Sequence, residues 1–374
     1  MKKINKNILW KYWVNVCRFL LAATFIFSGF VKAVDPKGVS YKIQDYFTLF
    51  HITSLLSSYI PVVLAIALSI LEFWIGACLL FGVRRRSCTL FVLAMMVILT
   101  PLTLFLAIAN PISDCGCFGD AITLTNWQTF WKNIILLMAA ISVFIGRNLI
   151  APFVSNSLQW LFSLYSIIYS LVLAVYCLMN LPIIDFRPYY KGVNISQAMS
   201  VPKDAKQPVY RTDLIYEKNG MKKAFTIDNY PKDGSWKFVD SKNVLVEKGY
   251  EPPINDFSLE DEKTGIDITQ QLLHRKGYVF FFFADRLDRA NEDDLGLING
   301  AYDDAVGKGY LFYCVTSSPE KDIIQWNDRT GAEYKFLLGD EVVLKTIVRS
   351  NPGLVLLYNG TVINKWNHAG IPDL

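Results

Sequence analysis

The chain has 374 residues, of which 52% are hydrophobic and 19% are charged, and its formal net charge is +4. The apolar share exceeds that of an ordinary soluble domain, and nearly all of the excess lies before residue 182. Because the net charge is small and no dense basic stripe with interleaved aromatic residues occurs, we expect no nucleic-acid partner. Seven cysteines, mostly scattered singly, do not describe a disulfide-dense scaffold.

Five windows in the first half of the chain are long and apolar enough to cross a bilayer as helices, which takes about 20 residues each. These windows cover residues 13–34, 59–81, 87–109, 127–146 and 158–181. The first is too long for the apolar region of a cleaved signal peptide, and it contains Arg18, so we interpret it as a retained helix. Residues 1–181 are therefore predicted to form an α-helical membrane bundle, with the lipid bilayer as its first partner.

Lysine and arginine in short loops favour the cytoplasmic side of a membrane, which gives the bundle a predicted orientation. Several lysines precede the first predicted span, arginines at 84–86 separate the second from the third, and Arg147 follows the fourth. The segment 110–126 contains neither lysine nor arginine. We therefore expect a cytoplasmic N-terminus, with segment 110–126 and everything after Leu181 extracytoplasmic (periplasmic), as in a bacterial inner-membrane protein.

Ionisable residues inside predicted spans are costly and usually face protein or a water-filled cavity. At about 1.5 Å per residue, Arg18 and Glu72 lie roughly 8 and 13 Å from the same end of their helices, so their side chains could meet. We hypothesise a buried ion pair that holds the first two spans in register, and the alternative is a proton-linked or substrate-linked site. Lys32 and Lys132 lie near the outer helix ends and are expected to extend to the interface.

The loop sequence Asp-Cys-Gly-Cys-Phe-Gly-Asp at 114–120 carries the most chemical information in the chain. Cys115 and Cys117, one residue apart on an oxidising face, could exchange between dithiol and disulfide, and Gly116 would relax the backbone of so small a ring. The alternatives are a structural disulfide, a soft-metal site such as copper, and simple packing. Only His51 is expected on the same face as a further ligand, so we assign no metal-ligating residues.

One further cysteine, Cys177, is predicted near the same side of the membrane as this loop. Cys17, Cys78 and Cys88 fall near the opposite helix ends, about 30 Å away across the bilayer. A thiol relay from the loop through Cys177 is therefore a secondary hypothesis.

Several short motifs in the membrane half resemble those of a known family. The residues Phe-Ser-Gly-Phe-Val-Lys-Ala at 27–33, which include Gly29, precede Asp-Pro and resemble the first-helix signature of DoxX-type membrane proteins. Leu-Glu at 71–72 and the apolar, glycine-containing stretch after it resemble their second helix. The Cys-Gly-Cys-Phe-Gly loop, which ends at Gly119, and Thr-Phe-Trp-Lys-Asn at 129–133 are similar to the methylamine-utilisation protein MauE.

The resemblance to DoxX and MauE proteins covers roughly residues 10–146. It implies a four-helix bundle related in outline to vitamin K epoxide reductase. It also implies a role in thiol redox chemistry or protein maturation, since MauE is linked to the maturation of a disulfide-rich dehydrogenase. The fifth predicted span and the long C-terminal extension depart from the MauE pattern.

The second half of the chain is predicted to form an extracytoplasmic linker over residues 182–252 and a folded domain over residues 253–374. Within the linker, two short apolar segments flank Asn219-Gly220 and predict a β-hairpin. Asp233-Gly234 marks a further turn.

In the predicted domain, residues 278–283 and 310–315 are apolar runs typical of strands buried on both faces, with a helical stretch between them. Two later segments, 354–357 and 362–366, predict a hairpin. This βαβ unit followed by a hairpin resembles the α/β thioredoxin fold in its peroxiredoxin-like or TlpA-like form. The resemblance implies a cis peptide bond before Pro352.

The thioredoxin family carries Cys-x-x-Cys after its first central strand, but residues 284–290 contain no thiol in this chain. Cys314 lies in the next predicted strand and is expected in the core. The domain is therefore predicted to bind a partner rather than to exchange disulfides on its own.

Our leading hypothesis is an inner-membrane protein that supports extracytoplasmic thiol–disulfide chemistry or protein maturation through Cys115 and Cys117, with a client protein or a thiol reductant as partner. The alternative is a non-catalytic membrane scaffold whose thioredoxin-like domain binds a partner. A third hypothesis is a transporter or metal handler built on Arg18 and Glu72. No cofactor is identified from the sequence: a quinone would suit the chemistry, but no quinone-binding fingerprint is visible.

Overall fold

The computed structural model describes residues 6–52, 57, 59–112, 114–202, 204–206, 209–218, 221–226, 229–231, 235–247 and 249–372. Within these residues, five helices are long and apolar enough to cross a membrane. They are α1 (Lys6–Val34), α3 (Ile60–Phe81), α4 (Arg85–Ala109), α5 (Asn126–Ile145) and α6 (Gln159–Met179). The chain is therefore a multi-pass membrane protein.

The most extensive helix contact in the bundle joins α1 to α3. A methyl group at Gly29 of α1 would overlap the backbone of Phe73, and one at Gly76 of α3 would lie 2.5 Å from the backbone nitrogen of Ile26. Small residues at a helix contact let the two backbones approach, which is a common basis of helix packing in membranes. As a consequence, polar side chains near these glycines can reach from one helix to the other.

The apolar core of the bundle is built from four of the long helices. Its buried members include Leu21 of α1, Ile75 of α3, Met96 of α4 and Leu136 of α5. The fifth long helix, α6, packs against α3 and α1. Two short 3-10 turns, η2 (Arg147–Leu149) and η3 (Asn156–Leu158), lie in the connection from α5 to α6.

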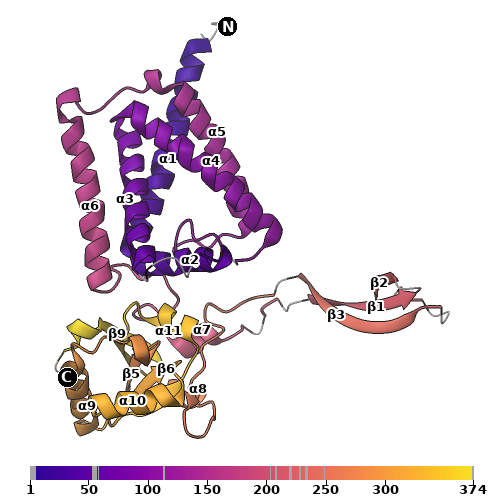
Figure 1. Ribbon diagram of the computed structural model, residues 1–374, viewed down its shortest axis with the longest axis vertical. Coiled ribbons are helices and arrows are strands. Elements are labelled where there is room, and N and C mark those ends of the chain that lie inside the picture. The colour runs from indigo at the N-terminus through magenta and orange to yellow at the C-terminus, as the bar shows by residue number, and fades with distance from the viewer. Residues whose placement is uncertain are drawn as a thin grey trace.

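A helix that sequence analysis did not predict, α2 (Pro36–Leu49), lies across one end of the bundle (Figure 1). It has 14 residues and mixed polarity, which is too short for a membrane span and leaves little hydropathy signal. Asp35 caps its first turn by accepting a hydrogen bond from the backbone N–H of Gly38 at 2.9 Å, and Pro36 occupies the first helical position, which suits proline.

The two ends of the bundle carry different connections (Figure 1). The start of α1, the turn between α3 and α4 and the turn η2 lie at one end. The helix α2 and the loop between α4 and α5 lie at the other end, beside the C-terminal unit (Figure 1). The loop between α4 and α5, which carries Cys115 and Cys117, and the C-terminal unit therefore share one side of the bundle. The assignment of that side to the periplasm stays a prediction.

The C-terminal unit is built on a six-stranded sheet with the order β4-β7-β6-β5-β8-β9. The strands are β4 (Glu260–Asp261), β5 (Tyr278–Ala284), β6 (Leu311–Thr316), β7 (Lys335–Leu338), β8 (Gly353–Tyr358) and β9 (Thr361–Asn367). The strands β5, β6 and β7 are parallel, whereas β8 runs antiparallel to β5 and pairs with β9 as a hairpin. The helices around the sheet are α8 (Thr269–Leu273), α9 (Leu295–Gly307), α10 (Glu320–Thr330) and α11 (Glu341–Ile347).

Side chains of the central strand β5 alternate between two apolar cores, one on each face of the sheet. Phe281 and Phe283 pack into the core that is covered by α8 and α11, and Phe280 and Phe282 pack into the core that is covered by α9 and α10. Successive side chains of a strand point to opposite faces, so a strand buried on both sides needs the uninterrupted apolar run seen here. Short turns η4 (Leu287–Arg289) and η5 (His368–Gly370) follow β5 and β9.

The segment predicted as the start of the linker contributes to this C-terminal core. Tyr189 and Ile195 are buried in the same cluster as Phe281, and the short helix α7 (Ile195–Met199) begins in the segment. Asn194 forms a bridge with Thr361 of β9. The C-terminal unit therefore begins well before residue 253, because its apolar face needs cover from the preceding chain.

The remaining strands form a separate three-stranded antiparallel sheet, which extends away from the rest of the molecule (Figure 1). Its strands are β1 (Val209–Lys218), β2 (Met221–Thr226) and β3 (Lys237–Glu247), in the order β2-β1-β3. The predicted hairpin corresponds to β1 and β2, and β3 was not predicted. The predicted turns at Asn219-Gly220 and Asp233-Gly234 lie outside the described residues.

Candidate functional site

Two thiols lie close together in the loop between α4 and α5. The sulfur atoms of Cys115 and Cys117 are 3.1 Å apart, and both residues are free cysteines. Gly116 between them has a φ of +67°, a left-handed conformation that favours glycine. The backbone therefore turns sharply enough at Gly116 to bring both side chains to the same place.

Neighbouring helices hold this thiol loop (residues 114–120) through its carbonyl groups. The Ser28 hydroxyl on α1 donates to the carbonyl of Cys117 at 2.6 Å. The Tyr46 hydroxyl on α2 donates to the carbonyl of Cys115 at 3.2 Å. The loop is therefore attached to both α1 and α2. Cys115 and Cys117 themselves lie against the inside of the bundle.

A cavity of about 220 Å³ lies inside the bundle against the two thiols. Most of its wall is apolar and comes from α1, α3, α4 and α5, with Phe25, Leu68, Met96, Leu99 and Leu136 among the lining residues. The polar part of the wall consists mainly of Ser28, Lys32, Lys42, Tyr46, Glu72, Lys132 and Asn133 beside the cysteines. An apolar pocket with a few polar groups is typical of small-molecule sites.

A buried ion pair between α1 and α3 forms part of this wall. Lys32 donates to both carboxylate oxygens of Glu72 at 2.7 and 2.6 Å and to the hydroxyl of Ser28 at 2.9 Å. Lys32 and Glu72 are each only 4% exposed. The expectation that Lys32 extends to the membrane interface is therefore wrong, because Glu72 and Ser28 satisfy its three N–H groups inside the bundle.

The hypothesis that Arg18 pairs with Glu72 is also wrong. Arg18 donates instead to the carbonyls of Leu79 and Leu80 at 2.6 and 2.7 Å. The last carbonyls of a helix lack partners within it and carry partial negative charge, so the end of α3 is the nearest acceptor for this guanidinium. Glu72 lies two turns earlier on α3, at the level of Lys32.

The surroundings make the two cysteines chemically different. The hydrogen bond from Cys115, helped by the ammonium groups of Lys132 and Lys32, lowers the pKa of Cys117 to about 6, although burial opposes this shift. The same hydrogen bond, together with burial, raises the pKa of Cys115. Lys132 also lies over the ring of Phe118, 4.3 Å from its centroid. Cys117 is therefore the more readily ionised thiol of the pair.

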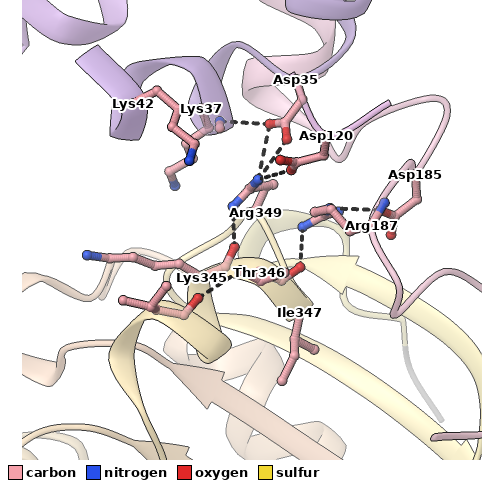
Figure 2. Close-up of polar contacts among 12 residues, drawn as sticks. Asp35, Lys37, Lys42, Asp120, Asp185, Arg187, Lys345, Thr346, Ile347 and Arg349 are labelled. Carbon is pink, nitrogen blue, oxygen red and sulfur yellow. Dashed lines mark hydrogen bonds and ion pairs between the residues drawn. The ribbon is translucent and has the colours of Figure 1, made fainter. Parts of the chain in front are cut away.

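The thiol loop is also bound to the C-terminal unit, through Arg349 (Figure 2). Arg349 donates to both carboxylate oxygens of Asp35 at 3.2 and 2.9 Å and to Asp120 at 2.8 Å. A fourth bond, to the carbonyl of Lys345 at 2.6 Å, fixes the guanidinium within its own unit. Its carbon centre lies 5.5 Å from the ring centroid of Tyr41 on α2. Since Asp120 belongs to the thiol loop, the loop contacts both halves of the molecule.

A second contact joins the chain after α6 to the C-terminal unit. Arg187 donates to Asp185 at 2.7 Å and to the carbonyl of Thr346 on α11 at 2.8 Å (Figure 2). Asn367 of β9 donates to the carbonyl of Met179 at the end of α6, at 2.8 Å. The C-terminal unit is thus attached at the thiol loop and at the end of the last membrane helix.

The structure gathers some predicted site residues and separates others. Cys115, Cys117 and Glu72 line one cavity. Cys177 is buried on α6 and is not among the lining residues, so the relay stays a prediction.

In the C-terminal unit, Cys314 is fully buried in β6, and the peptide bond before Pro352 is cis. Among the described residues, no group of three or more His, Cys, Asp or Glu side chains could hold a metal ion.

Several functional candidates were not found from the sequence. Ser28 and Lys32 are four residues apart on one face of α1, and this spacing was an available signal. The contacts of Arg349 with Asp35 and Asp120 join segments far apart in the chain, and no local sequence pattern predicts them.

Two family models match parts of the chain. Residues 10–146, from α1 to the end of α5, match the family model described as Methylamine utilisation protein MauE. Residues 210–248, which hold the separate three-stranded sheet, match Domain of unknown function (DUF8463). No curated protein matches the chain.

Proposed function

We propose that the membrane domain performs thiol–disulfide exchange on the extracytoplasmic side, with Cys115 and Cys117 cycling between dithiol and disulfide. The observation that carries this proposal is a pair of thiols 3.1 Å apart on the wall of a cavity. The low pKa of Cys117, about 6, supports it further. The thiolate is the reactive form of cysteine, and a thiol with this pKa is mostly thiolate at neutral pH.

The cavity suits a membrane-soluble electron acceptor. Closing the disulfide from the Cys117 thiolate and the Cys115 thiol releases two electrons and one proton, and a quinone accepts these together with a second proton. The apolar wall from α3, α4 and α5 matches the ring and tail of such a molecule, and the nearby ammonium and amide groups match its oxygens. The disulfide would then pass to a client protein by exchange, in which a client thiolate attacks one of the two sulfurs.

The C-terminal unit would bring the client or reductant to the thiol loop. Its parallel β5 and β6 joined through α9, followed by the β8–β9 hairpin, support a thioredoxin-like fold. Since residues 284–290 contain no cysteine, we assign this unit a binding role. Its contact with Asp120 through Arg349 places it directly at the loop.

Sidedness is part of the proposal. The junction of α3 and α4, which holds the arginines at 84–86, and the turn η2, which begins at Arg147, lie at the bundle end opposite the thiol loop (Figure 1). An excess of such residues favours the cytoplasmic face. This arrangement supports an inner-membrane protein whose thiol loop and C-terminal unit face the periplasm.

Thiol trapping in intact cells tests the proposal. A membrane-impermeant maleimide added from outside should label Cys115 and Cys117 after mild reduction, and the labelled fraction should fall when the quinone pool is oxidised. Cys314→Ala, in the core of β6, serves as a control that should leave the cycle unchanged. A pair that stays oxidised under all tolerated conditions would support the non-catalytic scaffold instead.

A further inference from the structure

We propose that Lys32 is the proton donor of the thiol reaction, held in place by Glu72, and that it regains its proton from Cys117 when a client re-reduces the disulfide. This inference rests on the proposed function and assigns the ion pair of α1 and α3 a role in it.

The contacts of Lys32 connect it to both the cavity and the thiol loop. Glu72 accepts two of its hydrogen bonds and Ser28 the third, and the Ser28 hydroxyl in turn donates to the carbonyl of Cys117 at 2.6 Å. Lys32, Ser28, Glu72 and Cys117 all line the cavity. With only 4% of Lys32 exposed, its ammonium group can exchange a proton with a molecule in the cavity more readily than with bulk water.

Beside the two sulfurs, the positive charge of Lys132 is matched only while Cys117 is a thiolate. The positive groups on its wall are Lys32 of α1, Lys42 of α2 and Lys132 of α5, and α4 contributes apolar residues. Asp114 pairs with Lys42 at 2.8 Å, and Asp45 of α2 also acts on Lys42. Glu72 pairs with Lys32 at 2.6 Å, and the Cys117 thiolate is the negative group that acts on Lys132. Tyr46 of α2 and Cys115 are the other titratable groups that line the cavity.

Disulfide formation removes the negative charge of Cys117 and leaves one positive charge without a partner. An uncompensated buried charge is strongly unfavourable. Loss of a proton from Lys32 restores the balance, since the carboxylate of Glu72 is then left to balance the charge of Lys132 on the wall of the same cavity. Lys32 is the most buried of the three lysines and is therefore the group whose excess charge solvent can least screen.

The step balances in atoms and electrons. The S–S bond forms, the S–H bond of Cys115 and one N–H bond of Lys32 break, and an acceptor of the quinone class in the cavity gains two electrons and these two protons. When a client dithiol later reduces the disulfide by exchange, Cys115 and Cys117 each regain a proton, and Cys117 passes its proton to the neutral Lys32. The net reaction turns a client dithiol and a quinone into a client disulfide and a quinol.

The first test counts protons in the unaltered protein. Reduced full-length protein in detergent is oxidised anaerobically with decylubiquinone at pH 7.5, in weak buffer with a pH indicator. We expect no net proton uptake from the medium for each disulfide formed. Uptake of one proton for each disulfide would show that Lys32 keeps its proton, and the inference would be wrong.

The second test separates charge from proton transfer. Lys32→Arg keeps a positive charge but cannot release a proton. Reoxidation by decylubiquinone should slow roughly 100-fold, the scale of general acid catalysis, while alkylation of Cys117 still begins near pH 6. The matched control Lys321→Arg, at an exposed position of α10, should reoxidise at the normal rate. Normal reoxidation of Lys32→Arg would overturn the inference but leave the proposed function intact, whereas an unaltered protein that is never oxidised would remove both.

Discussion

At the scale of single residues, one glycine separates two cysteines that the surrounding charges make unequal. Cys115 donates its hydrogen bond to Cys117, and Lys132 and Lys32 stabilise the negative charge that results. A nearby positive charge favours the charged form of an acid. In the proposed cycle Cys117 is therefore the nucleophile of the pair, and Cys115 is the thiol that retains its proton until the disulfide closes.

This inequality predicts the pH dependence of alkylation. Since the pKa of Cys117 is lowered to about 6, its reactivity toward iodoacetamide should stay high at neutral pH and fall only as the pH drops through about 6. In Lys132→Met the midpoint should rise toward about 8.5, the usual value for cysteine. Mass spectrometry of the modified peptide measures both. A midpoint near 8.5 in the unaltered protein would contradict the assignment of the thiolate.

At the scale of elements, the contact of α1 with α3 determines where the ion pair lies. Lys32 follows Gly29 by three residues, so both face α3. Glu72 lies beside the backbone of Phe73, which Gly29 touches. The close approach at these glycines therefore brings Lys32 and Glu72 within hydrogen-bond distance.

Gly76→Ala should separate these helices. Its methyl group would lie 2.5 Å from the backbone of Ile26, and overpacking of this kind costs about 1–3 kcal/mol. The control Gly300→Ala on α9 meets no atom within 4 Å and should instead stabilise by up to about 1 kcal/mol, because alanine favours a helix. Thermal unfolding in detergent measures both changes. An unchanged unfolding temperature in Gly76→Ala would show that α1 and α3 can move apart without loss of stability.

The sequence predicts some of these elements better than others, for physical reasons. Apolar windows such as that of α4 are visible because a bilayer requires about 20 apolar residues in succession. The short helix α2 is stabilised by its cap at Asp35 and by contacts with other elements, and no long apolar run marks it. Similar depth in the membrane predicts that Arg18 meets Glu72, but depth does not specify which acceptor is nearest, and the free carbonyl groups at the end of α3 are nearer.

The same limit applies to the site. Its cysteines could be predicted because Cys-Gly-Cys is a local motif. The cavity, the approach of Lys32 to Glu72 and the contact of Arg349 with Asp120 depend on how distant segments pack. Such contacts are a property of the folded chain, so a single sequence does not reveal them.

At the scale of the whole molecule, Arg349 links the C-terminal unit to the membrane domain. Removing one partner of a buried charge pair typically costs about 2–5 kcal/mol at an interface. Arg349→Ala should therefore weaken docking and speed hydrogen exchange in the loop 114–120 and in α2. The control Arg289→Ala removes an exposed pair with Glu341 and should leave exchange unchanged. Equal hydrogen exchange in Arg349→Ala and Arg289→Ala would show that Arg349 does not hold the two halves together.

Gly38→Ala tests the same link without removing a charge. A methyl group at Gly38 would lie 2.7 Å from a terminal nitrogen of Arg349 and 2.5 Å from a carboxylate oxygen of Asp35. We expect it to displace Arg349 and to raise exchange in the loop 114–120, even though alanine favours the helix α2. Exchange at the level of the unaltered protein would mean that Arg349 can shift without loss of docking.

The most direct measurement of the central claim is the redox state of the two sulfurs after a single turnover. Reduced full-length protein in detergent is mixed with decylubiquinone, quenched with acid, alkylated and examined by mass spectrometry of the peptide that contains residues 114–120. The account predicts that Cys115 and Cys117 become joined to each other and that one quinol forms for each disulfide. Thiols that remain fully alkylated while the quinone stays oxidised would contradict it.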